Sequence, residues 1–265
     1  MLHHSTYTRS EAAPWVTFIH GAGGSSSIWY KQIRAFQDRF NILLIDLRGH
    51  GQSKSHLDHQ GSLPYTFDAI AREVIDVLDH LRISSTHLVG ISLGTIIVRE
   101  IAELRPEKVR SMVMAGAVMK MNIRGKILMR FGVWMKSLVP YLLLYKFFAL
   151  IIMPRKQHRE SRSLFIREAK KLAQKEFIRW FQLAADVNAK LKWFRMKELP
   201  IPTLYIMGDQ DHMFLPSIRH LVAAHSRTAR LAIAGNCGHV VNVEQPSYFN
   251  QTTLSFLQSM DAGTD

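Results

Sequence analysis

The pentapeptide Gly90-Ile91-Ser92-Leu93-Gly94 directly follows the apolar run at residues 86–89. This arrangement is typical of a serine at a sharp turn between a strand and a helix, the nucleophile elbow of G-x-S-x-G. The turn forces the serine into a strained backbone conformation, and glycines on both sides avoid clashes with strand and helix. The same residues also fit a glycine-rich turn with a helix-capping serine, so the surrounding sequence has to decide between the two.

Short apolar runs alternate with amphipathic helices on both sides of this turn. Strands are predicted at residues 15–20, 41–46, 86–91, 111–115, 202–207 and 229–233. Between the second and third of these, one apolar helical face is formed by Phe67, Ile70, Ala71, Val74, Leu78 and Leu81. A closing helix is predicted from about residue 246 to 259. This alternation predicts an α/β fold with a mostly parallel sheet and helices on both of its faces.

The alternation stops after Gly116 and resumes at residue 202. The interval between looks wholly helical and is rich in Lys, Arg, Met, Leu and Phe. We therefore predict a core domain formed by residues 1–116 and 200–265, with a helical cap inserted at residues 117–199. Within the cap, residues 138–153 are the most apolar stretch, but they are too short for a bilayer-spanning helix. They fit either a buried lid helix or an amphipathic element that touches lipid.

The formal net charge of +13 is concentrated in this interval. Residues 116–200 contain 19 Lys or Arg against 5 Asp or Glu, a net charge of +14, whereas the rest of the chain has 15 against 16. Such asymmetry fits a solvated helical surface, or a surface that contacts an anionic membrane, an acidic partner or an anionic substrate. No nucleic-acid-binding motif accompanies the charge, so nucleic acid is not expected as a partner.

The cysteine content and the N-terminal sequence limit other possibilities. Cys237 is the single cysteine, so the chain has neither an internal disulfide framework nor a metal-binding cysteine pair. The first residues lack a basic region followed by an apolar stretch, which makes a cytoplasmic enzyme the expectation.

His239 and Asp211 are the candidates for the base and the acid that a serine nucleophile needs. His239 lies in a loop between the last strand and the last helix, and Asp211 follows residues 202–207. Both loops are expected at the carboxyl ends of strands, where ligands of open α/β sheets bind. Asp209 is the alternative acid, although it also fits a turn-stabilising role. Several other histidines are expected to face solvent, namely His3, His4, His56, His59 and His225.

Two backbone N–H groups are expected to stabilise the oxyanion that forms when Ser92 attacks a carbonyl. One belongs to Leu93, the residue after the nucleophile, at the start of a helix whose dipole adds to the effect. The other is expected from Ala22 in the glycine-rich loop at residues 20–24. That loop lacks the spacing of a phosphate-binding loop.

In combination, these segments resemble the α/β-hydrolase superfamily, in particular serine esterase-like or lipase-like members with a helical cap. The matching stretches are His-Gly-Ala-Gly-Gly at 20–24, Asp-Leu-Arg-Gly-His-Gly-Gln-Ser at 46–53, the elbow, Gly208-x-x-Asp211, and Gly238-His239 followed by Glu244-x-Pro246. The resemblance implies a Ser92-Asp211-His239 triad, an oxyanion hole at Ala22 and Leu93, and no metal or organic cofactor. Residues 46–53 are mostly structural in this family and are left out of the predicted site.

The beginning of the chain departs from the family pattern. Only 14 residues precede the strand at residue 15, which is too few for the usual two leading strands. Residues 2–8 suffice for one such strand, so a shortened sheet edge is expected.

The nucleophile and the apolar cap favour a carboxylic-ester hydrolase that forms an acyl-enzyme on Ser92. Haloalkane and epoxide chemistry in this fold resembles enzymes with an aspartate nucleophile, so a serine argues against both. A Met-rich, apolar cap suggests a small-molecule ester with an apolar acyl or aromatic group.

Two alternatives stay open at the level of sequence. A C–C bond hydrolase or lyase would use the same triad on a carboxylate-bearing substrate, and cap arginines such as Arg124, Arg130 or Arg179 pointing into the pocket would support it. A ligand-binding signalling protein built on the same fold would also keep these motifs. The oligomeric state is not predicted.

Overall fold

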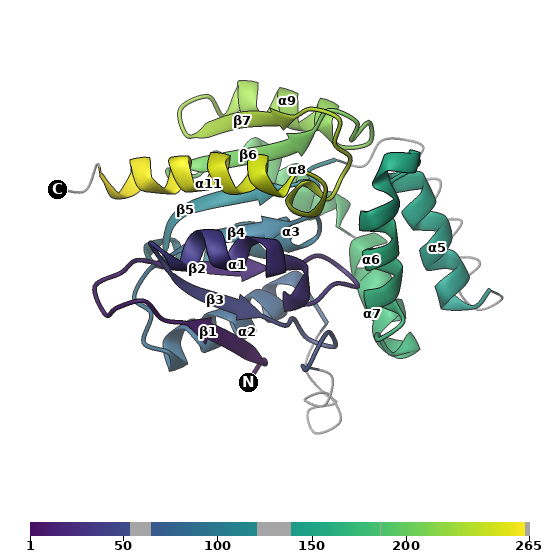
Figure 1. The fold of residues 1–265 in the computed structure, drawn as a ribbon, viewed down its shortest axis with the longest axis horizontal. Coiled ribbons are helices and arrows are strands. Elements are labelled where there is room, and N and C mark those ends of the chain that lie inside the picture. The colour runs from purple at the N-terminus through teal and green to yellow at the C-terminus, as the bar shows by residue number, and fades with distance from the viewer. Residues whose placement is uncertain (54–64, 121–138, 186, 263–265) are drawn as a thin grey trace.

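The computed structural model describes residues 1–53, 65–120, 139–185 and 187–262. Within these residues, seven strands form one sheet in the order β1-β3-β2-β4-β5-β6-β7 (Figure 1). In chain order the strands are β1 His4–Tyr7, β2 Trp15–Ile19, β3 Asn41–Ile45, β4 Thr86–Ile91, β5 Val109–Ala115, β6 Thr203–Gly208 and β7 Ala229–Ala234. β1 pairs antiparallel with β3, and every other pair is parallel. The α/β class and the mostly parallel sheet are therefore confirmed, as is the single leading strand.

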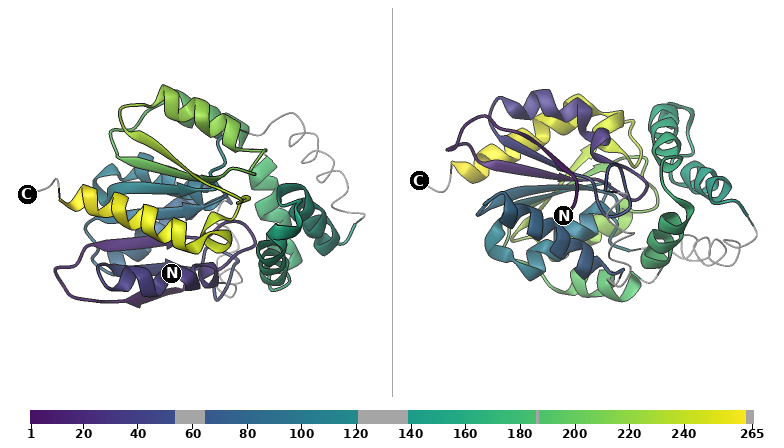
Figure 2. Two further views of the ribbon diagram at one scale, coloured as in Figure 1. Left: turned by 45° about the horizontal axis from the view of Figure 1, so that its top comes forward. Right: turned by 90° about the horizontal axis from the view of Figure 1, so that it is seen from below.

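Helices cover both faces of this sheet (Figure 2). One face packs against α1 Tyr30–Gln37, α10 Val241–Glu244 and α11 Pro246–Asp261. The other packs against α2 Phe67–His80, α3 Gly94–Leu104, α8 Asn188–Met196 and α9 Leu215–Ala224. Because β4 lies in the middle of these layers, all six of its residues are buried. This explains why its sequence is a continuous apolar run and not an alternating one.

Helix α2 shows how local sequence determines one of these helices. The Thr66 side chain accepts a hydrogen bond from the Ala69 N–H group at 3.1 Å and so caps the first turn. The predicted apolar face is buried at Phe67, Ile70, Ala71, Val74 and Leu78. Leu81 lies just beyond the end of the helix and is partly buried.

In its described part, the chain between β5 and β6 places helices α5, α6 and α7 beyond the carboxyl ends of the strands (Figures 1 and 2). They are α5 Tyr141–Ile152, α6 Arg159–Ala169 and α7 Gln174–Ala185. Together with α8 they are called the insertion helices below. Short 3-10 turns lie at η1 Ser26–Trp29, η3 Pro106–Lys108 and η4 Lys156–His158. Helices α5, α6 and α7 share a small apolar cluster of their own, which includes Leu144, Tyr145 and Phe177.

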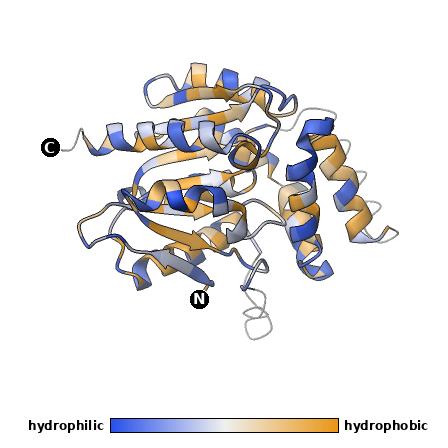
Figure 3. Ribbon diagram, in the orientation of Figure 1, coloured by the Kyte–Doolittle hydropathy of each residue, from blue (hydrophilic) through white to orange (hydrophobic). Residues whose placement is uncertain are grey.

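Helix α5 is the described part of the apolar stretch predicted at residues 138–153. It is apolar along most of its length, while neighbouring α6 is more polar (Figure 3). Its residues Leu144, Tyr145 and Ala149 are buried, but other large apolar side chains of the helix face solvent. No helix in the described part of the chain is long and apolar enough to cross a membrane.

Candidate active site

Ser92 lies at the turn between β4 and α3 in a left-handed backbone conformation, with φ at +53°. This conformation is strained for a residue with a side chain, and it persists only where surrounding structure enforces it. A Cβ atom at Gly94 would lie 2.5 Å from the carbonyl oxygens of both Ile19 and His20. One at Gly90 would lie 2.7 Å from Val98 Cγ2. The distances support the steric reason for a glycine on each side of the serine.

The structure brings Ser92, His239 and Asp211 into one chain of hydrogen bonds. His239 Nε2 lies 2.8 Å from Ser92 Oγ, and His239 Nδ1 lies 2.8 Å from Asp211 Oδ2. Since a carboxylate only accepts, Nδ1–H donates to Asp211 and Nε2 is left to accept the Ser92 hydroxyl proton. Asp211 Oδ1 also accepts the Phe214 N–H group at 3.1 Å, which fixes the carboxylate. His239 and Asp211 are both buried.

The alternative acid occupies a different position. Asp209 is exposed, and its Oδ1 accepts the Cys237 N–H group at 3.0 Å. It therefore holds the loop that leads to His239 and does not contact the imidazole ring. Of the two aspartates in this loop, Asp211 is the one that forms a hydrogen bond with His239.

Ala22 and Leu93 line the same cavity as Ser92 and His239. A Cβ atom at Gly21 would lie 3.1 Å from Ser92 Cβ, so the glycine-rich loop rests directly on the elbow. Within the described residues, neither the Ala22 nor the Leu93 N–H group donates a hydrogen bond to the protein. Neither N–H group is therefore committed to a partner within the described protein, and both belong to residues that line the cavity at Ser92.

Two histidines missed by sequence reasoning hold this loop in place. The Gly23 N–H group, at a residue with φ of +70°, donates to His50 Nε2 at 2.8 Å. His20 Nε2 accepts the Leu47 N–H group at 3.0 Å, and its Nδ1 donates to the Gly21 carbonyl at 2.7 Å. Burial lowers the pKa of His20, which keeps the ring neutral and able to accept. Residues 46–53, left out of the predicted site as structural, thus support the glycine-rich loop at residues 20–24.

Tyr145 and Glu168 bring two further polar groups to the cavity from the insertion helices. The Tyr145 hydroxyl donates to the Ala22 carbonyl at 2.9 Å. Burial, with the charge of Glu168, raises the pKa of Tyr145 well above its usual value, so the phenol stays protonated. Glu168 accepts the Ser25 hydroxyl at 2.9 Å and pairs with Lys171 at 2.6 Å. Neither residue belongs to a motif, so nothing in the local sequence singled them out.

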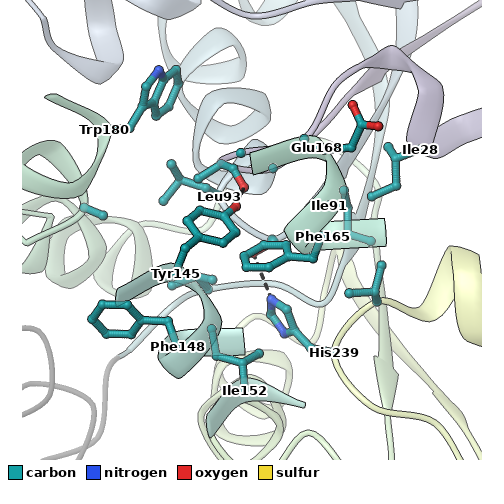
Figure 4. Close-up of a pocket in the computed structure, with 18 of the residues that line it drawn as sticks. Ile28, Ile91, Leu93, Tyr145, Phe148, Ile152, Phe165, Glu168, Trp180 and His239 are labelled. Carbon is teal, nitrogen blue, oxygen red and sulfur yellow. Dashed lines mark hydrogen bonds between the residues drawn. The ribbon is translucent and has the colours of Figure 1, made fainter. Parts of the chain in front are cut away.

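The cavity beside Ser92 has a volume of about 190 Å³, and most of its lining is apolar. Figure 4 shows the rings of Tyr145 and Phe165 together in its wall, with centroids 4.3 Å apart. Other apolar side chains of the wall are Ile28, Val118, Phe148, Ile152, Met153, Leu164, Phe177, Trp180, Phe181 and Phe214. Among the described residues that line the cavity, His239 and Glu168 are the side chains that can act as acid or base near neutral pH. Tyr145 also lines it, but its hydroxyl stays protonated.

Of the three cap arginines considered at the level of sequence, Arg179 is the one that the structure describes, and it does not line the cavity. Arg179 is exposed, pairs with Glu176 at 2.8 Å and stacks over the Tyr65 ring. Arg124 and Arg130 lie outside the described residues. No arginine or lysine of the described chain therefore faces the site.

The expectation that His225 faces solvent is wrong. His225 is buried, and its Nε2 lies 3.0 Å from the Arg195 carbonyl oxygen. Since a carbonyl accepts, the ring donates there, and this partner offsets the cost of burying the imidazole. Within the described ranges, no group of three His, Cys, Asp or Glu side chains is placed to hold a metal ion.

The chain is similar to known proteins along almost its whole length. A family model described as the alpha/beta hydrolase fold matches residues 14–246. The chain is 27% identical, over 98% of its length and 99% of the relative's, to a protein of Agrobacterium fabrum provisionally named carbamate hydrolase RutD. It is 24% identical to 3-oxoadipate enol-lactonase 2 of Acinetobacter baylyi, covering 97% of this chain and 93% of that one.

A solved structure has the same architecture. A hydrolase from Pseudomonas aeruginosa superposes with a TM-score of 0.80 at 23% identity, over 97% of this chain and 94% of the other. At this identity the likeness concerns the fold alone.

Proposed function

The chain belongs to the α/β-hydrolase fold family and is an enzyme of that type, and we propose that it is a serine carboxylic-ester hydrolase. The observation that best supports the proposal is the hydrogen-bond chain Ser92–His239–Asp211, whose serine and histidine line an apolar cavity. A serine, a base on its hydroxyl and a carboxylate behind the base together form the set of groups needed for acyl transfer.

The proposed reaction proceeds in two balanced steps. His239 Nε2 takes the Ser92 proton while Ser92 Oγ attacks the ester carbonyl, and the Ala22 and Leu93 N–H groups stabilise the oxyanion. The tetrahedral intermediate collapses, His239 gives the proton to the departing alcohol, and an acyl-enzyme remains. Water then loses a proton to His239 and attacks the acyl carbon, which releases the carboxylic acid and returns the proton to Ser92.

The cavity wall favours a neutral ester with an apolar acyl or aromatic group. Burial of such a group in an apolar wall contributes about 25 cal/mol for each Å² removed from water. No arginine or lysine of the described residues lines the cavity to bind a substrate carboxylate, and the acidic side chain of Glu168 does line it. This disposition of charge supports ester hydrolysis over the C–C bond reaction on an anionic substrate. The names of the relatives, a lactonase and a carbamate hydrolase, fit attack on an acyl carbon bonded to oxygen.

The first test is the release of p-nitrophenol from esters of increasing acyl length, by the native protein and by Ser92→Ala. We expect Ser92→Ala to lower kcat about 10³-fold or more. The far-UV circular dichroism and the melting temperature should stay unchanged, because the hydroxyl is removed while the turn keeps its geometry. An otherwise matched ester with a terminal carboxylate should have the lower kcat/KM.

The outcomes separate the candidates. Turnover retained by Ser92→Ala would refute the nucleophile assignment. Absence of turnover by the native protein on every ester would refute ester hydrolysis, and would shift the assignment to the C–C bond reaction or to ligand binding without turnover.

A further inference from the structure

Helix α5 exposes an apolar stripe on the side opposite the cavity. Tyr145, Phe148 and Ile152 line the cavity, whereas the stripe consists of Leu143, Phe147 and Leu150. These three side chains are 54%, 45% and 53% exposed. Their spacing of four and three residues places them on one face of the helix. A helix at a protein surface normally turns a polar face to water, so an apolar outer face indicates another contact.

Basic side chains surround this stripe. Lys146 is exposed, and because it follows Leu143 by three residues, it lies on the same face of the helix as the stripe. At the start of α5, the Tyr141 hydroxyl donates to the Leu172 carbonyl at 3.0 Å, which brings the exposed Lys170 near that end. At the other end, the exposed residues Arg155 and Lys156 follow shortly after the helix.

The acidic residues of this region do not offset that charge. Residues 139–185 contain ten Lys or Arg and three Asp or Glu. Each of the three acids already has a cationic partner: Glu160 pairs with Lys31, Glu168 with Lys171 and Glu176 with Arg179. The surroundings of the apolar stripe are therefore cationic.

We propose that the outer face of α5, formed by Leu143, Lys146, Phe147 and Leu150, docks on an anionic lipid surface. The apolar side chains enter the acyl boundary, while Lys146 extends its charge to the headgroups. A helix of 12 residues is about 18 Å long, so it lies in the plane of the interface and does not cross the bilayer. Docking of a second copy is disfavoured, because it would bring two cationic faces together. The proposal does not depend on ester hydrolysis.

The test is co-sedimentation of the full chain with vesicles containing about 30 mol% phosphatidylserine and with vesicles of phosphatidylcholine alone. We expect binding to the anionic vesicles at about 0.05 M salt, and weaker binding at about 0.5 M, where charges are screened. The triple variant Leu143→Ser/Phe147→Ser/Leu150→Ser should lower the partition coefficient about tenfold or more. Lys146→Glu, which changes only charge, should lower it about fivefold or more.

The matched control is Trp193→Ser/Met196→Ser, which removes two exposed apolar side chains of α8, 54% and 71% exposed. It should bind vesicles like the native protein, and circular dichroism checks that all variants are folded. The proposal is overturned if the native protein ignores anionic vesicles at low salt, or if the α5 variants bind as well as the control. Dimerisation of the native protein that the triple variant abolishes, without vesicle binding, would instead make this face a self-association surface.

Discussion

Replacing Tyr145 with phenylalanine removes the one oxygen atom that joins helix α5 to the proposed oxyanion loop. The hydroxyl donates to the Ala22 carbonyl at 2.9 Å, and the side chain is only 5% exposed. The ring keeps its neighbours in the variant, because it packs on Phe165 and Phe177 with centroids 4.3 Å and 5.7 Å away. The substitution Tyr145→Phe therefore deletes a hydrogen bond with little change in the shape of the cavity.

The expected loss follows from the strength of that bond. A hydrogen bond of this kind contributes about 0.5–1.5 kcal/mol net, which corresponds to roughly threefold to tenfold in a rate. Because the bond positions the loop that carries the Ala22 N–H group, the loss should fall on kcat while KM stays within about twofold. The raised pKa of Tyr145 keeps the donor protonated, so the ratio of native to variant kcat should not change between about pH 6 and pH 9.

The assay is the determination of kcat and KM on one p-nitrophenyl ester. Tyr141→Phe is the matched control. Tyr141 lies on the same helix as Tyr145 and its hydroxyl donates to the Leu172 carbonyl, but Tyr141 does not line the cavity. Native kcat in Tyr145→Phe, or an equal loss in Tyr141→Phe, would refute the positioning role. A rise in KM at constant kcat would refute it as well, since it would assign the hydroxyl to ground-state binding.

Three further predictions concern the triad, the elbow and pH. Asp211→Asn should lower kcat about 10³- to 10⁴-fold, whereas Asp209→Asn, measured in the same ester assay, should keep most of the activity. Gly94→Ala should lower the free energy of unfolding by about 2 kcal/mol in urea titrations, because its Cβ would lie 2.5 Å from two carbonyl oxygens. Gly235→Ala is its control, since nothing lies within 4 Å of that Cβ, and equal losses would contradict the steric argument. Burial lowers the pKa of His20 in the folded protein, so the unfolded chain binds a proton first as pH falls below about 6.5. The contribution of His20 to the free energy of unfolding is therefore full above that pH and declines below it, with a limiting slope of about 1.4 kcal/mol per pH unit. In His20→Asn this slope should become shallower between pH 7 and 5, and an unchanged slope would remove His20 as its source.

The sequence by itself determined the elements whose requirements are local. Buried parallel strands need continuous apolar runs, and such runs marked the strands from β2 to β6, whereas the edge strand β7 is only partly buried. The elbow was readable because close contacts exclude a side chain at Gly90 and at Gly94, two residues before and two residues after Ser92, so that glycine is required at both positions. His239 and Asp211 were readable as candidates because parallel strands all deliver their following loops to one edge of the sheet.

Only the tertiary structure decided which groups meet at that edge. Asp211 contacts His239, whereas Asp209 supports the loop before it. Which aspartate takes which role depends on the backbone path of a few residues, and no rule of sequence spacing determines that path. The contact of Tyr145 with Ala22 joins residues 123 positions apart, and helix α5 has no polar face to reveal which side packs inward. The orientation of α5 is set by its packing against α6, α7 and the core, and this packing separates the stripe exposed to solvent from the wall of the cavity.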